Sequence, residues 1–232
     1  MPIEIDEGAL AQVKEMFKVL NDDVKIYFFR KDNRCEYCDD IEHILDTIGK
    51  LSEKLHVVKL SEGSNEAKRH NIPMFPAILI HGKKEYNIRY FGIPAGYEFG
   101  ALIEDIIDVS RGDVELDPYL KEVIREKVKK PVRLMVFVTP TCPYCPLAVR
   151  TSHRLAIINT NISGDMIEAL EFQDLANKYL VYAVPKIVIQ VENEDKTEFE
   201  GALPPSNFVA KILEALGEEV PPDIISRLGE TG

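Results

Sequence analysis

The chain has 232 residues, enough for one large or two small domains that each bury a core. Its apolar content of 45% is ordinary for a globular protein and excludes a disordered chain. A formal net charge of −11, with no basic block and no apolar run near the roughly 20 residues of a spanning helix, argues against nucleic acid or a membrane as the main partner.

The pattern along the first half predicts helix, strand, helix, two further strands and a closing helix. Apolar periodicity predicts the first helix over Glu7–Leu20, and the apolar run Val24–Phe29 predicts the strand that follows. A Cys-x-x-Cys pair comes next and opens a helix whose apolar side chains fall on one face. A short strand then begins at Pro76, and the closing helix is predicted over Glu98–Val109.

The second half repeats this order. A helix is predicted over Pro118–Val128 and a strand over Val132–Val138, directly before the second Cys-x-x-Cys pair. A strand begins at Pro185, and the last helix is predicted over Ser206–Leu216. The stretch from Pro221 to the end is predicted to stop that helix and to fray.

Matching residues in the two halves keep a nearly constant offset. The cysteines are offset by 107 residues, and both the prolines and the glycines Gly92 and Gly201 by 109. Such an internal repeat predicts two similar units, residues 1–115 and 116–232, joined near the polar stretch Arg111–Asp117. Strand, helix, strand, hairpin and closing helix indicate an α/β fold in which each unit has a central mixed β-sheet flanked by helices.

All four cysteines lie in the two pairs, which is most simply interpreted as a tandem dithiol–disulfide exchanger. Exchange needs a thiolate, and free cysteine with a pKa near 8.5 is mostly protonated at neutral pH. A helix N-terminus lowers that pKa through its unpaired N–H groups and dipole. We therefore predict Cys35 and Cys142, placed there, as exposed attacking sulfurs. Cys38 and Cys145 would be buried resolving thiols.

The order strand, Cys-x-x-Cys, helix, Pro-strand, strand, Gly and helix resembles the thioredoxin fold. Two such units in one chain resemble the glutaredoxin-like protein disulfide oxidoreductases of thermophilic archaea and bacteria, and the resemblance covers nearly the whole sequence. The second motif, with Pro143 and Tyr144 between its cysteines, is similar to the glutaredoxin active site. The first, with Glu36 and Tyr37, is less specific, and its place in the repeat supports it.

The resemblance implies further site features. Pro76 and Pro185 would follow cis peptide bonds, with Phe75 and Val184 offering their backbone to a substrate peptide. Tyr37 and Tyr144 are expected to shield the motifs and shape the substrate groove. The resemblance also implies protein disulfides as substrates, no bound cofactor, and an upstream NADPH-dependent flavin thioredoxin reductase.

The sequence departs from the thioredoxin pattern before each motif. Thioredoxin-like proteins often bury a carboxylate in that strand, where it assists proton transfer to the resolving thiol. Six residues before each first cysteine stand Phe29 and Val136, both apolar. Glu168 is a candidate replacement, although a solvated or capping role is the favoured interpretation.

The N-terminus is acidic and lacks the features of a signal peptide, which predicts a cytoplasmic protein. A reducing cytosol disfavours structural disulfides, except in hyperthermophiles. The 29% of charged residues and the presence of only three glutamines favour a thermophilic source.

Other interpretations of the cysteines are weaker. A shared four-thiolate metal site would space its knuckles by some 15–20 residues, whereas 103 separate these pairs, and the five histidines show no ligand spacing. We therefore expect no metal. Structural disulfides that close such small loops gain little entropy. A Cys–His hydrolase needs one special cysteine, and a redox-inert peptide-binding scaffold would be expected to have lost a sulfur.

The two pairs are not expected to be equivalent. Glu36 places a negative charge beside Cys35, which should raise the pKa of that thiol and weaken it as a leaving group. Pro143 favours a glutaredoxin-like potential at the second pair. We hypothesise that Cys142 and Cys145 carry more of the activity, and the direction of exchange (reduction, formation or isomerisation of disulfides) stays open.

Overall fold

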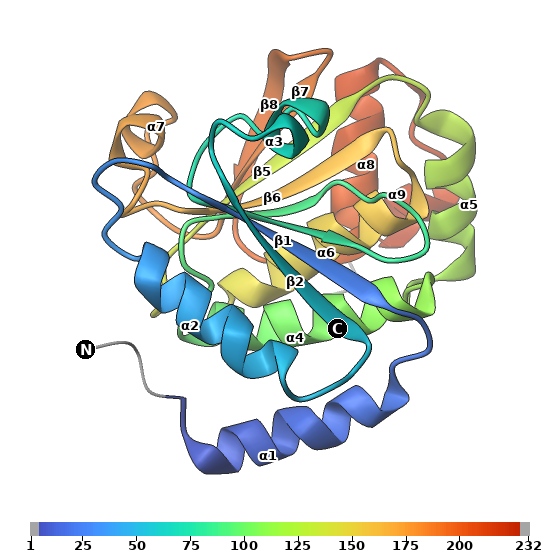
Figure 1. Cartoon of the computed structure of the whole chain (residues 1–232). Coiled ribbons are helices and arrows are strands. Elements are labelled where there is room, and N and C mark those ends of the chain that lie inside the picture. Colours follow the sequence, from blue (N-terminus) through green and yellow to red (C-terminus); the bar gives the residue numbers. More distant parts are fainter. Residues whose placement is uncertain (1–4, 228–232) are drawn as a thin grey trace.

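The computed structural model describes residues 5–227, and its helices and strands follow the predicted order (Figure 1). The first half contains α1 (Glu7–Met16), the 3₁₀ turn η1 (Phe17–Val19), β1 (Val24–Arg30), α2 (Cys38–Gly49), β2 (Leu55–Ser61), α3 (Asn65–Arg69), β3 (Ala77–His81), β4 (Ile88–Phe91) and α4 (Tyr97–Arg111). The second contains α5 (Pro118–Lys127), β5 (Val132–Val138), α6 (Cys145–Ile158), β6 (Ile162–Glu168), α7 (Gln173–Lys178), β7 (Lys186–Val191), β8 (Glu194–Glu200), α8 (Pro205–Leu216) and α9 (Pro222–Arg227).

One mixed sheet of eight strands, in the order β2-β1-β3-β4-β6-β5-β7-β8, runs through both halves. In each half a parallel pair (β1 with β2, β5 with β6) is extended by two antiparallel strands. The predicted α/β class with a mixed sheet in each unit is confirmed. Nothing in the sequence pattern indicated that β4 pairs in parallel with β6, which makes the two sheets continuous.

Alternate side chains of the strands belong to two hydrophobic cores, because successive residues of a strand point to opposite faces of the sheet. Ile26 and Phe28 of β1 pack with the long helices α2, α4, α6 and α8 on one face. Tyr27 and Phe29 pack on the other face, which the short helices α3 and α7 cover. The larger core lies on the long-helix face and contains both Cys38 and Cys145.

The structure corrects two sequence predictions, the end of the first helix and the frayed C-terminal tail. The first α-helix ends at Met16 and tightens into the 3₁₀ turn η1 before Leu20. The predicted frayed tail instead begins with α9, because Pro222 starts a helical turn, Ile224 is buried, and Arg227 Nη1 binds Asp117 Oδ2 at 2.6 Å. The structure does not describe residues 228–232, which belong to that tail. It also does not describe residues 1–4, the start of the segment in which no signal peptide was predicted.

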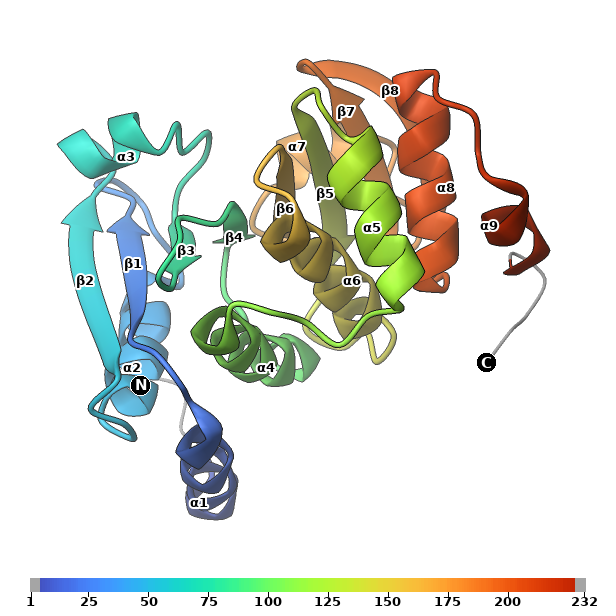
Figure 2. The same cartoon turned by 90° about the vertical axis from the view of Figure 1, so that its right-hand side faces the viewer.

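Helix α4 is the last element of the first half of the chain but packs against α6 of the second (Figure 2). Its start lies on the loop before the second cysteine pair, where the Tyr97 N–H donates to the Pro140 carbonyl oxygen at 3.2 Å. Gly96 precedes that contact with φ +60°, and an added Cβ would stand only 2.2 Å from the same oxygen. Glycine is therefore required there, and the contact ties α4 to the loop that carries Cys142.

Candidate functional site

The first cysteine pair lies where β1 leads into α2. Cys35 and Cys38 form a disulfide with their Cα atoms 5.5 Å apart. Cys35 is partly exposed, while Cys38 is fully buried as the first residue of α2. The pair thus presents one sulfur-bearing residue to the surface and one to the core.

The second pair occupies the matching place between β5 and α6. Cys142 and Cys145 form a disulfide with the same Cα separation of 5.5 Å. The backbone N–H of Cys145 donates to Cys142 Sγ at 3.1 Å, and the Val184 carbonyl oxygen lies 3.7 Å from that sulfur. Cys142 is only 8% exposed and is therefore more enclosed than the exposed sulfur predicted from the sequence.

Both helices begin at the second cysteine of each pair, so the first cysteine lies before the helix and not inside its first turn. Tyr37 and Tyr144 occupy the N-cap positions, and neither makes a side-chain cap bond. The first N–H groups of a helix have no partner within it. At α6 one of them points at Cys142 Sγ, which is the placement that stabilises a thiolate.

The predicted proline positions lie beside the pairs. The peptide bonds Phe75–Pro76 and Val184–Pro185 are both cis. Phe75 and Pro76 line a cleft together with Cys35, and Val184 contributes the carbonyl group next to Cys142. The structure thus brings together the residues that the sequence singled out, while their roles in substrate binding stay a prediction.

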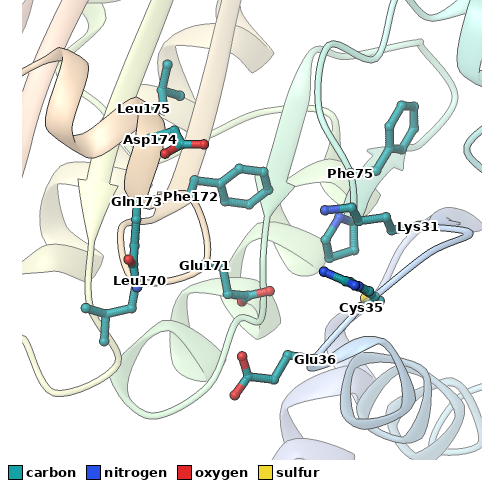
Figure 3. Close-up of a pocket in the computed structure, with 12 residues that line it drawn as sticks. Lys31, Cys35, Glu36, Phe75, Leu170, Glu171, Phe172, Gln173, Asp174 and Leu175 are labelled. Carbon is teal, nitrogen blue, oxygen red and sulfur yellow. The ribbon is translucent and has the colours of Figure 1, made fainter.

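The cleft beside Cys35 has a volume of about 480 Å³ and lies between the two halves of the chain (Figure 3). Lys31, Arg34 and Glu36 line it from the first half. Residues 170–175 line it from the second half, and Figure 3 shows the Glu171 carboxylate facing the side on which Cys35 lies. This wall was not predicted, since residues 170–175 lie more than 130 positions from Cys35 and carry no motif.

Two neighbouring carboxyl groups carry raised pKa values: Glu171 in that wall, and Glu168 at the end of β6. Burial, followed by the charges of Glu168 and Glu36, raises the pKa of Glu171 to about 7 against a hydrogen bond from the Ile93 N–H. Burial also raises the pKa of Glu168. Glu168 Oε2 accepts from the Glu171 N–H at 2.6 Å in the turn between β6 and α7. The side chain is 2% exposed and its Oε1 has no partner among the described residues, so the solvated role favoured from the sequence is wrong.

A second cleft, of about 330 Å³, lies beside the other pair. Thr139 and Val184, which flank Cys142 in the fold, line it together with Leu170, Gln173 and Tyr182. None of the described residues that line this cleft is charged, in contrast to the cleft at Cys35. Leu170 and Gln173 line both, so the two clefts share a wall, and Leu170 and Tyr182 are largely exposed there.

One further carboxyl group was not predicted from the sequence. Glu98 lies in the first turn of α4, directly after the contact with Pro140, and is 1% exposed. Neither of its carboxyl oxygens has a hydrogen-bond partner among the described residues. Burial, with the charge of Asp105, raises its pKa to about 8. A protonatable carboxyl group is thus buried in the helix that contacts the loop before Cys142.

Comparisons with known proteins agree with this architecture. The thioredoxin domain family matches residues 132–214, which cover most of the second half. The chain is similar to a subunit of the alkyl hydroperoxide reductase of Staphylococcus epidermidis, with 24% identity over 179 residues, 77% of this chain and 32% of that one. It spans about a third of the length of the curated relatives that it matches.

Solved structures cover nearly the whole chain. A protein disulfide oxidoreductase from Aeropyrum pernix K1 superposes with a TM-score of 0.83 at 26% identity, over 93% of this chain and 96% of that one. The corresponding alkylhydroperoxide reductase subunit from Enterococcus faecalis gives a TM-score of 0.80 at 22% identity, over 90% of this chain and 99% of the solved one.

Fold and site define the class: this is a chain of the thioredoxin fold with two paired-cysteine sites of the disulfide oxidoreductase type. The resemblance to protein disulfide oxidoreductases stated from the sequence is confirmed by the match to the Aeropyrum pernix structure. In residues 5–227 we find no helix that is both long and apolar enough to cross a bilayer.

Proposed function

We propose that the chain catalyses dithiol–disulfide exchange with protein substrates at both cysteine pairs. In the reducing direction, the Cys142 thiolate attacks one sulfur of a substrate disulfide, and the other substrate sulfur leaves and takes up a proton. Cys145 then loses its proton and attacks Cys142 Sγ. This releases the second substrate thiol, so the substrate gains two electrons and the Cys142–Cys145 disulfide forms. Cys35 and Cys38 would act in the same way.

The observation that carries the proposal is the N–H group of Cys145 directed at Cys142 Sγ at 3.1 Å. This hydrogen bond stabilises negative charge on the sulfur that is nearer to the surface, while the fully buried Cys145 is kept from outside thiols. The exposed apolar side chains of Leu170 and Tyr182 beside the pair suit an extended protein segment as the substrate.

Reduction of insulin disulfides by dithiothreitol tests the activity. We expect the wild-type chain to accelerate it and the double variant Cys35→Ser/Cys142→Ser to fall to the uncatalysed rate. Cys145→Ser should accumulate a covalent mixed disulfide on Cys142, visible by mass spectrometry, because the resolving thiol is gone. Catalysis that persists in the double variant contradicts the proposal.

The two pairs are proposed to contribute unequally. Glu36, the residue next to Cys35, places a negative charge beside that thiol and disfavours its thiolate, although Lys31 and Arg34 line the same cleft and offset part of this effect. The cleft beside Cys142 has no charged lining residue among those described. We therefore expect Cys142→Ser to remove the larger share of the insulin-reducing rate. Equal losses from Cys35→Ser and Cys142→Ser would show that the pairs are equivalent.

The redox partners, the cellular location and the type of source organism are also proposals. We propose that a redox partner of the thioredoxin reductase type, using flavin and NADPH, returns electrons to the pairs. A disulfide of a hydroperoxide-reducing protein is a second candidate substrate, since the similar Staphylococcus protein is a subunit of alkyl hydroperoxide reductase. A cytoplasmic setting stays a proposal, and the high content of charged residues supports a thermophilic source.

A further inference from the structure

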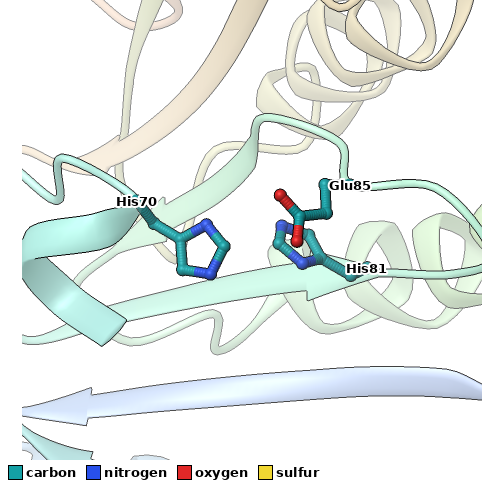
Figure 4. A group of neighbouring side chains, drawn as sticks. All are labelled: His70, His81 and Glu85. Carbon is teal, nitrogen blue, oxygen red and sulfur yellow. The ribbon is translucent and has the colours of Figure 1, made fainter. Parts of the chain in front are cut away.

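Three potential metal ligands converge far from the cysteines. His70 ends α3, His81 is the last residue of β3, and Glu85 lies in the loop between β3 and β4 (Figure 4). One ligand atom of each residue lies within 4.8 Å of the other two. The histidines show no ligand spacing along the sequence, because the fold creates this cluster by bringing the end of α3 onto β3.

We propose that His70, His81 and Glu85 bind a divalent transition-metal ion, for which Zn²⁺ is the best fit. Two imidazole nitrogens and one carboxylate oxygen are a donor set that zinc takes in sites with three protein ligands and one open position. Imidazole favours zinc and its neighbours in the transition series over Mg²⁺ and Ca²⁺, which prefer oxygen ligands. A modest inward movement of the side chains would bring the three atoms to bonding distance.

His81 is prepared for this role by its surroundings. It is 6% exposed, and its ring stands edge-on to the His70 ring, with the two ring centroids 4.8 Å apart. The fold thus holds one imidazole in place beside the other.

A second feature that points to a bound ion is a ring nitrogen of His70. Its Nε2 atom is buried and has no hydrogen-bond partner among the described residues. A buried polar atom without a partner calls for a specific explanation, such as a bound ion. The Tyr27 ring packs against both imidazoles and closes the inner side of the cluster. Its centroid lies 5.6 Å from that of the His70 ring and 5.5 Å from that of the His81 ring.

Glu85 lies on the side of the cluster that faces solvent. Its carboxylate is exposed and forms an ion pair with Arg69 through Oε1. An ion pair between exposed side chains is weak, so the arginine can move aside at little cost when a metal ion binds the carboxylate. The site is therefore reachable from solvent.

Metal binding there is expected to be independent of the redox sites. His81 pairs in register with Lys25 near the start of β1, whereas Cys35 follows the end of that strand. The cluster also lies on the face of the sheet that α3 covers, and Cys38 belongs to the core of the opposite face. The inference thus goes beyond the proposed exchange activity and does not rest on it.

The test uses full-length, untagged protein with both disulfides formed, checked by mass spectrometry so that no thiol can bind metal. Titration calorimetry with ZnCl₂ and the visible spectrum with CoCl₂ are both expected to show one ion per chain. His81→Ala and Glu85→Gln should each weaken Zn²⁺ binding by about 10- to 100-fold or more, since loss of even an outer-shell partner has that effect. The exposed His43→Ala and Glu53→Gln serve as matched controls and should bind like wild type.

Glu85→Gln keeps the test valid if the buried His81→Ala variant fails to fold, because Glu85 is exposed. Absence of Zn²⁺ and Co²⁺ binding by the wild-type chain would overturn the proposal. So would an unchanged affinity in the Glu85→Gln and His70→Ala variants, because the ion would then bind elsewhere. Equal competition by MgCl₂ would also overturn it, since a site built on imidazole nitrogen discriminates against Mg²⁺.

Discussion

At the scale of single residues, two glutamates far from the cysteines in sequence stand out: one lines the cleft at Cys35, and the other is buried on α4. A Cys-x-x-Cys pair after an apolar strand is a local pattern, and the chain repeats it. Glu171 reaches the cleft at Cys35 from the other half, and Glu98 is buried by the packing of α4. The thioredoxin pattern predicts a buried carboxylate in the strand before each pair, where Phe29 and Val136 stand. The buried glutamates lie elsewhere: Glu168 at the end of β6, and Glu98 on α4.

Glu98 makes the stability of the protein fall as pH rises. Its folded pKa of about 8 lies above the ordinary value of 4.5, so between these pH values the folded chain holds a proton that the unfolded chain releases. The free energy of unfolding therefore decreases over this window. Each pKa unit corresponds to about 1.4 kcal/mol, so the Glu98 contribution amounts to a few kcal/mol.

Urea unfolding of oxidised wild-type and Glu98→Gln protein at pH 5, 7 and 9 measures this effect. We expect the variant to gain stability relative to wild type as pH rises, because glutamine carries no charge to desolvate. The exposed Glu122→Gln variant on α5 should follow the wild-type profile. A Glu98→Gln profile that stays parallel to wild type across this range would show that Glu98 does not titrate there.

At the scale of elements, the two helices that follow the cysteine pairs were not equally predictable. In α2 the apolar residues Ile41, Ile44, Leu45 and Ile48 fall on one face and are all buried. In α6 the pattern is weaker because the helix is enclosed on several sides, and Arg150 and His153 are buried among its apolar residues. Buried polar residues obscure the amphipathic pattern of a helix. Their burial is explained only by the helix against which they pack.

The partner is α4, through a buried ionic cluster. Asp105 of α4 accepts hydrogen bonds from Arg150, from the Tyr90 hydroxyl and from His153 Nδ1 at 2.5 Å. Arg150 also donates to Asp108 at 2.7 Å. Burial would raise the pKa of Asp105, but the charges of Arg150 and His153 outweigh it and lower the pKa. The cluster therefore keeps Asp105 ionised and holds α4 against α6.

We expect Arg150→Met to destabilise the protein by about 3–5 kcal/mol, since it leaves two buried carboxylates without their main cation. Arg154→Met is the matched control. Arg154 is more exposed and, among residues 5–227, forms an ion pair with Asp108 alone, at 3.3 Å, so its loss should cost about 1 kcal/mol or less. Chemical denaturation at pH 7 compares the two. Similar losses for both variants would show that the buried cluster is no stronger than a surface ion pair.

At the scale of the whole molecule, the repeat predicted two units but gave no sign of the shared sheet. The pairing of β4 with β6 joins residues 76 positions apart across α4, α5, β5 and α6. Strand β6 also contains Gly164 and Asp165, which weaken its strand pattern in the sequence. Both residues have a spatial reason: Gly164 lies against the His153 ring, and Asp165 binds arginines from both halves.

Asp165 is fully buried at the junction of the halves. Arg89 of β4 binds both of its carboxylate oxygens, at 2.7 and 3.0 Å, and Arg133 Nε of β5 binds one at 2.5 Å. Burial would raise the pKa of Asp165, but the two arginines outweigh it and lower the pKa. Because the folded pKa is depressed, this contribution to stability is present at neutral pH and is lost as pH falls below the ordinary carboxyl range.

The halves should consequently unfold together, and Asp165 should be the residue on which that coupling depends. Asp165→Asn leaves Arg89 largely buried without an anion, which we expect to cost about 3–5 kcal/mol. In calorimetry it should split or broaden the single thermal transition that we expect of the wild-type chain. Glu192→Gln removes the Lys130 ion pair, whose side chains are both 57% exposed, and should leave the transition single and its midpoint nearly unchanged. If Asp165→Asn instead shifts the midpoint no more than Glu192→Gln does, the halves are joined by the backbone ladder of β4 and β6 alone.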